Sequence, residues 1–193
     1  MRRVQPCLCC TVTPDWVCEA PSRRGLLGAA LGLGAALLAR PALAVGEPRE
    51  ISITRVGTGD NFTGVYWQDG RYVAEALQQL NWVLRDPHID EATPMDPRLF
   101  DVLHGVAQQM DATPHYEVIS GYRSPETNAA NARKSRRVSR ASLHMSGMAA
   151  DVRMPGRDSM GLARLAANMQ IGGVGLYRRD GFVHLDCGPA RRW

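Results

Sequence analysis

Hydrophobic and polar residues alternate with a period of two in the first clearly patterned part of the chain. Residues 51–53 read Ile-Ser-Ile and residues 64–67 read Gly-Val-Tyr-Trp, and each run is followed by a cluster of turn-forming residues, at 57–60 and at 69–70. Short runs bounded by glycine and aspartate are typical of β-strands joined by turns. We therefore predict β-structure over residues 47–72.

Apolar residues recur three and four positions apart in three later segments, at residues 72–84, 96–110 and 158–169. This spacing gathers them on one face, so the pattern predicts three amphipathic helices. The pairs Asp96-Pro97 and Ser124-Pro125 have the residue types that cap and begin helices. The first pair marks the start of the second helix, and the second pair predicts a fourth helix.

Four short runs, at residues 116–119, 149–154, 172–177 and 181–186, predict further strands. The last two runs are joined by a tight turn, which is typical of a hairpin. The resulting element order is β, α, α, β, α, β, α, β, β. We therefore expect the α+β fold class, as a single compact domain with a small, mostly antiparallel sheet and flanking helices.

The first 44 residues have the pattern of an export signal. Arg23-Arg24 precede an uncharged run rich in glycine, alanine and leucine, and Ala42-Leu43-Ala44 follows after Arg40. A basic segment, a short apolar run and small residues in an A-x-A pattern define a secretory signal, and paired arginines are typical of twin-arginine export. A retained membrane anchor is the alternative, but the run is shorter than the roughly 20 residues that span a bilayer.

We therefore predict a twin-arginine signal peptide at residues 1–44, a periplasmic or cell-envelope location, and no membrane span once the signal is removed. The net charge of the whole chain is +4, but five arginines and two carboxylates fall before residue 45, so residues 45–193 carry only +1. A nearly neutral domain lacks the field that holds a polyanion, so nucleic acid is not an expected partner. Cys187 is the single cysteine after Ala44, which excludes an internal disulfide in the mature domain.

Three residues in the second half of the chain have the types that a hydrolytic zinc site needs. His144 precedes a predicted strand, Asp151 lies on that strand, and Gly147 lets the loop between them fold back. His184 lies on another strand and can supply a third nitrogen or oxygen ligand, which leaves one open position on the ion. Strand residues two apart point the same way, so Asp186 is expected on the same side as His184. Spacing alone also leaves a structural role open for His184.

The segment Ser142–Asp151 reads Ser-x-His-x-x-Gly-x-Ala-x-Asp and resembles the motif of the M15-type zinc peptidases. Further matching motifs occur in one order along the chain: Ile119-Ser-Gly-Tyr-Arg-Ser-Pro125, Thr127-Asn128, Gly172-Gly-Val-Gly175, Phe182-Val-His184 and Gly188-Pro-x-Arg-x-Trp193. Together they resemble the murein endopeptidase K branch over essentially the whole chain after Ala44. The resemblance implies that zinc is held by His144, Asp151 and His184, and that Arg123 contacts a substrate carboxylate or the oxyanion.

The function that the resemblance implies is that of an exported zinc metallopeptidase acting on stem peptides of cell-wall peptidoglycan. Ser142 is expected to orient the first ligand or to touch substrate. The wider superfamily often has an acidic residue at the position of Gly181, so the general base must lie elsewhere. We expect Asp186 to be the acidic residue that turnover needs most, either because it reaches the zinc-bound water or because it fixes the imidazole of His184, with Asp180 as its competitor. A non-catalytic peptidoglycan-binding module and a D-Ala-D-Ala-type carboxypeptidase or dipeptidase are the alternatives.

Overall fold

The computed structural model describes residues 46–135 and 138–193. Their helices and strands, in chain order, are β1 (Arg49–Arg55), β2 (Asn61–Gln68), β3 (Arg71–Tyr72), α1 (Ala74–Val83), α2 (Pro97–Gln109), β4 (His115–Ser120), α3 (Pro125–Lys134), the 3-10 helix η1 (Leu143–Ser146), β5 (Ala149–Arg153), α4 (Ser159–Met169), β6 (Gly173–Tyr177), β7 (Phe182–Asp186) and β8 (Arg191–Arg192).

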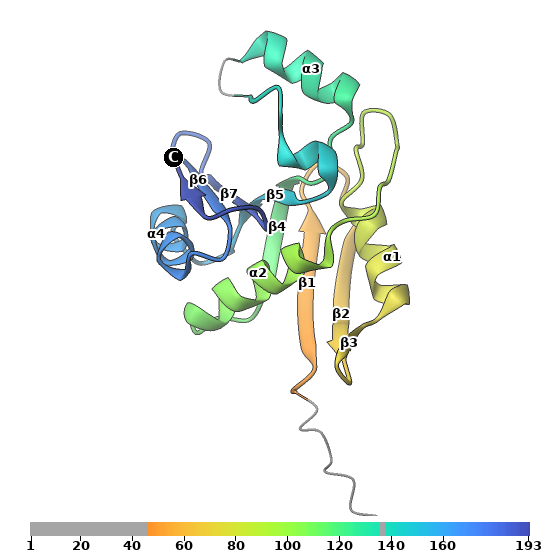
Figure 1. The fold of residues 1–193 in the computed structure, drawn as a ribbon, viewed down its shortest axis with the longest axis vertical. Coiled ribbons are helices and arrows are strands. Elements are labelled where there is room, and N and C mark those ends of the chain that lie inside the picture. Colours follow the sequence, from red (N-terminus) through yellow and green to blue (C-terminus); the bar gives the residue numbers. More distant parts are fainter. Residues whose placement is uncertain (1–45, 136–137) are drawn as a thin grey trace, which may run out of the picture. The chain divides into compact units, whose positions relative to one another are not determined.

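All these strands join one mixed sheet in the order β3-β2-β1-β4-β5-β7-β6-β8 (Figure 1). The pairs β1–β4 and β6–β8 are parallel, and the other five pairs are antiparallel. The predicted α+β class with a mostly antiparallel sheet is therefore confirmed. Strands β4, β5 and β7 lie next to one another in the middle of the sheet, although long stretches of sequence separate them.

Helices α2 and α3 begin where the predicted capping residues place them. Asp96 accepts a hydrogen bond from the backbone N–H of Arg98 at the start of α2, and Ser124 accepts one from Thr127 at the start of α3. Asp158 accepts two from the first turn of α4. Because the first N–H groups of a helix have no partner within it, each cap satisfies a donor that would otherwise be lost.

The hydrophobic core lies between the sheet and three of the helices. Helix α1 packs on β1 and β2, α2 packs on β1 and β7, and α4 packs on β6 and β7. The largest fully buried side chains are Tyr66, Tyr116, Phe100, Ile51, Ile53, Leu80, Leu84, Leu99, Leu103, Leu162, Leu185 and Val106. Helix α3 differs from the others, since its buried residues are the polar Thr127 and Asn128.

One short strand and one short helix are not predicted by the local pattern. Strand β8 is two residues long, and η1 is a single turn of 3-10 helix. Strand β8 exists because residues at the end of the chain pair with the distant β6, and such pairing leaves no local period of two.

Some predictions fall outside the described residues. These are the signal peptide with Arg23-Arg24 and the cleavage site after Ala44. Within the described part of the chain, no helix combines the length and the apolar character that a membrane span requires. Cys187 is buried there as a free thiol.

Candidate metal centre and its cavity

His144 enters the site from η1, a turn that a left-handed glycine ends. Gly147 has a φ of +67°, and a Cβ at this position would lie 2.7 Å from the carbonyl oxygen of Pro94. The ring of His144 is buried, with Nδ1 2.7 Å from the carbonyl oxygen of Gly121. A carbonyl only accepts, so Nδ1 is the donor of this hydrogen bond, and Nε2 on the other side of the ring faces Asp151 and His184.

Asp151 and His184 are direct neighbours across the sheet. They are paired in register on the antiparallel strands β5 and β7, which places their side chains on the same face of the sheet. The Nδ1 atom of His184 lies 2.9 Å from Oδ1 of Asp151. On the opposite side of the ring, Nε2 of His184 lies 3.1 Å from Oδ2 of Asp186, and a carboxylate there accepts the Nε2 proton.

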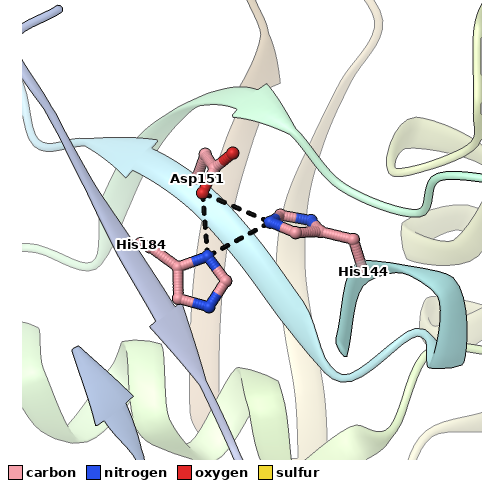
Figure 2. Close-up of side chains that lie close together, drawn as sticks. All are labelled: His144, Asp151 and His184. Carbon is pink, nitrogen blue, oxygen red and sulfur yellow. Dashed lines mark hydrogen bonds and ion pairs between the residues drawn. The ribbon is translucent and has the colours of Figure 1, made fainter. Parts of the chain in front are cut away.

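The three predicted residues meet at one point, as Figure 2 shows. His144 Nε2 lies 3.1 Å from His184 Nδ1 and 3.3 Å from Asp151 Oδ1. Four ligands placed tetrahedrally at zinc–nitrogen distances of about 2.0–2.1 Å lie about 3.3 Å from one another. Two imidazole nitrogens and one carboxylate oxygen at this spacing fit a metal ion, and the partners of the outer ring nitrogens select the tautomers that a metal needs.

The surroundings of Asp151 favour the ionised form of its carboxyl group. Burial raises the pKa of Asp151, but the two histidines outweigh this effect and hold that pKa below its ordinary value. Burial lowers the pKa of His184, while hydrogen bonds to Asp151 and Asp186 more than compensate and raise it. Asp151 is therefore ionised and needs a positive partner, either a proton on the imidazoles or a cation among the three side chains.

Asp186 does not face the site in the way that the sequence analysis predicts for a general base. Its side chain is fully buried behind His184, on the side of the ring that points away from Asp151. Its oxygens also accept hydrogen bonds from the backbone N–H groups of Gly173 and Gly188 and from Arg191. Strand alternation correctly places Asp186 on the same face as His184. A carboxylate enclosed in this way has no route to a water in the cavity, so its geometry fits orientation of the imidazole instead.

The cluster opens into a cavity of about 540 Å³. Besides His144, Asp151 and His184, it is lined by Arg123, Ser135, Val138, Ser139, Ala141, Ser142, Leu143, Tyr177, Asp180, Phe182, Arg191 and Trp193. The cavity thus contains the cluster together with two guanidinium groups, several hydroxyls and three aromatic rings. A volume of this size is typical of sites that take small molecules or short peptide segments.

Arg123 and Ser142, which the sequence analysis names as candidate substrate-contacting residues, both line this cavity. The guanidinium of Arg123 donates to Ser120 at 3.0 Å and lies 3.5 Å from Oδ2 of Asp151. Its backbone N–H donates to the carbonyl of His144, which ties the arginine to the first histidine. Ser142 immediately precedes η1 and is half-buried.

Asp180 also lines the cavity, from the turn between β6 and β7. Arg153 holds this turn, because its guanidinium donates to the carbonyl of Asp180 at 2.6 Å and to that of Gly181 at 3.0 Å. Asp180 and Asp151 are the carboxylates among the described residues that line the cavity.

Arg191 and Trp193 are parts of the site that the sequence reasoning missed. Both belong to the closing motif at residues 188–193, which the sequence analysis uses only to support a resemblance. In the structure Arg191 hydrogen-bonds to Asp186, and the centroids of the Trp193 and His184 rings lie 5.1 Å apart. The arginine and tryptophan of that motif were the available signal, because both side-chain types are frequent in binding sites.

Comparisons with known proteins agree with this geometry. A family model described as "Peptidoglycan L,D-endopeptidase MepK", of the M15 peptidases, matches residues 43–193. A protein of that name from Escherichia coli K12 is 36% identical over 178 residues, which cover 91% of this chain and 98% of the relative. A "Probable peptidoglycan L,D-endopeptidase MepK" from Haemophilus influenzae is 31% identical over 175 residues, 89% of this chain and 94% of the relative.

No solved structure gives a significant match to the chain. The family match spans all of the described residues, including the metal cluster, the cavity and the closing motif. The chain therefore belongs to the MepK family of M15 peptidases.

Proposed function

We propose that this chain is an exported zinc metallopeptidase that hydrolyses peptide cross-links of cell-wall peptidoglycan. The convergence of His144, Asp151 and His184 at the bottom of an open cavity, in a member of a family whose relatives are named L,D-endopeptidases, carries the proposal. By analogy with those names, the bond that it cleaves is an L,D-peptide bond between stem peptides. The enzyme then acts outside the cytoplasm, where peptidoglycan lies.

The donor set favours zinc as the resident ion. Zinc prefers two or three imidazole or carboxylate ligands with an open position at hydrolytic sites, and His144, Asp151 and His184 offer such a set. When bound, zinc supplies Lewis-acid polarisation of the scissile carbonyl and activation of water. In this proposal the chemistry takes place where the three side chains line the cavity.

Arg123 is the residue that we assign to the substrate's negative charge. Its guanidinium lines the cavity beside Asp151 and keeps N–H donors for an anionic or developing anionic oxygen. The anion that we assign to it is a stem-peptide carboxylate or the developing oxyanion. Ser142, which lines the same cavity, offers a hydroxyl that can hydrogen-bond to the peptide backbone of a substrate.

The proton transfer falls to Asp180 rather than to Asp186. Asp180 lines the cavity, and the hydrogen bond from Arg153 to its carbonyl oxygen keeps the backbone of this residue in place. In this role Asp180 takes the proton of the attacking water and passes it to the leaving amine. Asp186 instead holds the ring of His184 through Nε2.

Export is proposed to depend on residues 1–44 as a twin-arginine signal peptide cleaved after Ala44, which leaves residues 45–193 as the peptidase domain. Replacement of both Arg23 and Arg24 by lysine keeps the charge and removes the paired arginines. Cell fractionation and blotting should then show the precursor retained in the cytoplasm. Unchanged export would exclude the twin-arginine route and point to general secretion.

Digestion of purified sacculi tests the proposed activity. The wild-type protein should release soluble muropeptides, His184→Ala should release none, and His88→Ala should match the wild type because His88 is an exposed histidine outside the cavity. Separation of the products identifies the bond that is cleaved. Co-sedimentation with sacculi without release of fragments would contradict the proposal and identify a binding module. Cleavage of small dipeptides alone would identify a dipeptidase or carboxypeptidase.

A further inference from the structure

The end of the chain forms part of the wall of the metal centre. Strand β8 pairs in parallel with β6, with Arg191 opposite Gly173. The pairing continues to the final residue, because the N–H of Trp193 donates to the carbonyl of Val174 and the carbonyl of Trp193 accepts from Leu176. Backbone hydrogen bonds thus fix the two side chains of this segment that line the cavity, those of Arg191 and Trp193.

Arg191 hydrogen-bonds to Asp186, the carboxylate that accepts a hydrogen bond from His184. Its NH2 atom lies 2.7 Å from Oδ2 of Asp186 and its NH1 atom lies 3.1 Å from Oδ1, which is a two-pronged contact. Oδ2 is also the oxygen that accepts from Nε2 of His184 at 3.1 Å. A continuous chain of contacts therefore runs from an arginine side chain that is 42% exposed, through a fully buried carboxylate, to a histidine of the cluster.

The glycines of the motif at residues 172–175 make room for this chain of contacts. A Cβ at Gly173 would overlap Oδ2 of Asp186 and would lie 2.5 Å from NH1 of Arg191. A Cβ at Gly175 would lie 2.6 Å from the indole of Trp193. The sequence analysis leaves two motifs without a role, residues 172–175 and residues 188–193. The structure relates them, because the glycines of the first motif leave the space that side chains of the second motif occupy.

We propose that β8 is a positioning element of the metal centre, in which Arg191 fixes Asp186 and Asp186 fixes His184 with Nδ1 directed at the cluster. This inference rests on the proposed role of His184 as a metal ligand. The physical reason is that a carboxylate with one rotatable bond next to its oxygens can turn away from an imidazole. The guanidinium fork holds both oxygens at once, which an ammonium group cannot do. Groups behind a metal ligand in this way typically contribute 10–100-fold in metal affinity.

Arg191 also lines the cavity, so a direct contact with substrate is the competing role. The two roles predict different measurements. A positioning residue changes the affinity for the metal in the absence of substrate, whereas a substrate-binding residue raises KM and leaves metal affinity unchanged.

The test measures the zinc affinity of the purified full chain by competition with a chromogenic chelator, with thermal unfolding of the metal-free protein as a check on folding. Arg191→Met should lower the affinity about 10-fold, and Arg191→Lys should fall between Met and the wild type. Arg192→Met is the matched control, since it alters the neighbouring arginine of β8, which does not line this cavity, and it should leave the affinity unchanged.

A double-mutant cycle separates positioning from a general effect of the tail. In the Asp186→Asn background, Arg191→Met should have little further effect, because the arginine acts through that carboxylate. Additive losses, an unchanged affinity in folded Arg191→Met, or an equal loss in Arg192→Met would each overturn the inference. If Arg191→Met does not fold, Arg191→Lys decides, since an affinity equal to that of the wild type contradicts a role for the fork. A wild-type protein that binds no zinc would overturn the proposed function as well, whereas the other outcomes leave it standing.

Discussion

The metal cluster is built from two sides that the fold supports in different ways. The strand side consists of Asp151, His184 and the elements β5 to β8, where these two proposed ligands are cross-strand neighbours fixed by the sheet. The loop side consists of His144, Arg123, Ser142 and the elements α3 and η1. The strand side holds its ligands by register and a buried carboxylate, whereas the loop side depends on single hydrogen bonds and on a helix that buries two polar residues.

We infer from this difference that the two sides have different roles. A sheet holds side chains rigidly, which suits groups that must keep a fixed geometry around an ion. A loop adjusts more easily, which suits groups that contact a large and variable polymer. The following predictions test this division, from the largest expected effect to the smallest.

Removal of the metal should abolish activity without unfolding the protein. The strand ladder and the core between the sheet and its helices do not depend on an ion, so circular dichroism should be almost unchanged after chelation. Sacculus digestion should stop and should return when zinc is added back. If chelation removed the β-strand signal from the circular dichroism spectrum, the strand side would depend on the metal, which would contradict this account.

Asp180→Asn should lower the rate of sacculus digestion by about 10²–10⁴-fold at full metal content, the usual range for a proton-transfer group. The matched control is Asp69→Asn, because Asp69-Gly70 is an aspartate–glycine turn between β2 and β3, outside the cavity. Normal activity of Asp180→Asn would remove this residue from the mechanism.

Asp186→Asn should lower the affinity for zinc by about 10–100-fold while the rate at saturating zinc falls much less. An asparagine keeps the size of the side chain but loses the charge that faces His184 and Arg191. Chelator competition and digestion at matched zinc content separate the two quantities. A rate loss above 100-fold at full zinc would restore Asp186 as the proton-transfer group.

Arg123→Lys should raise KM about 10-fold with unchanged zinc content. Lysine keeps the charge but loses the fork that binds a carboxylate or oxyanion, and a hydrogen bond to a charged group contributes about 1.5–3 kcal/mol. The measurement is steady-state kinetics on purified cross-linked muropeptides. A loss of zinc in this variant would show that Arg123 supports the ligands instead.

Ser124→Ala should lower the free energy of unfolding by about 1 kcal/mol, because it removes the cap of α3. The midpoint of thermal unfolding should fall by about 2–4 °C. Activity should also fall, by less than 10-fold, because α3 belongs to the loop side of the cluster. Asp158→Ala removes the cap of α4, a helix with no residue in the cavity lining, and should cost similar stability with no change in activity.

The sequence predicts those features that local physics determines. Capping residues such as Asp96 and Ser124 mark helix starts because their side chains accept N–H groups a few residues away. Strand alternation places Asp186 beside His184 because the period of two is a property of the extended backbone. In the same way, glycine at position 147 indicates the left-handed turn that brings His144 toward the sheet.

The features that the sequence does not predict depend on contacts between distant residues. Which nitrogen of His184 faces the cluster follows from the positions of Asp151 and Asp186 around one ring, and alternation alone does not distinguish the two sides. For this reason the sequence leaves both a contact with water and a contact with the imidazole open for Asp186, whereas the structure places Asp186 behind the ring of His184. Strand β8 is not predicted because its partner in β6 lies 18 residues earlier, from Arg191 to Gly173, and a strand of two residues shows no period.

The most direct test of the account is the zinc content of the purified protein and of His184→Ala, measured by elemental analysis after identical dialysis. We expect about one zinc per wild-type chain, because His144, Asp151 and His184 form a single three-ligand site. His184→Ala should be depleted, and His88→Ala should equal the wild type. Full zinc retention in His184→Ala would contradict the assignment of this ligand and with it the metal centre on which the proposed function depends.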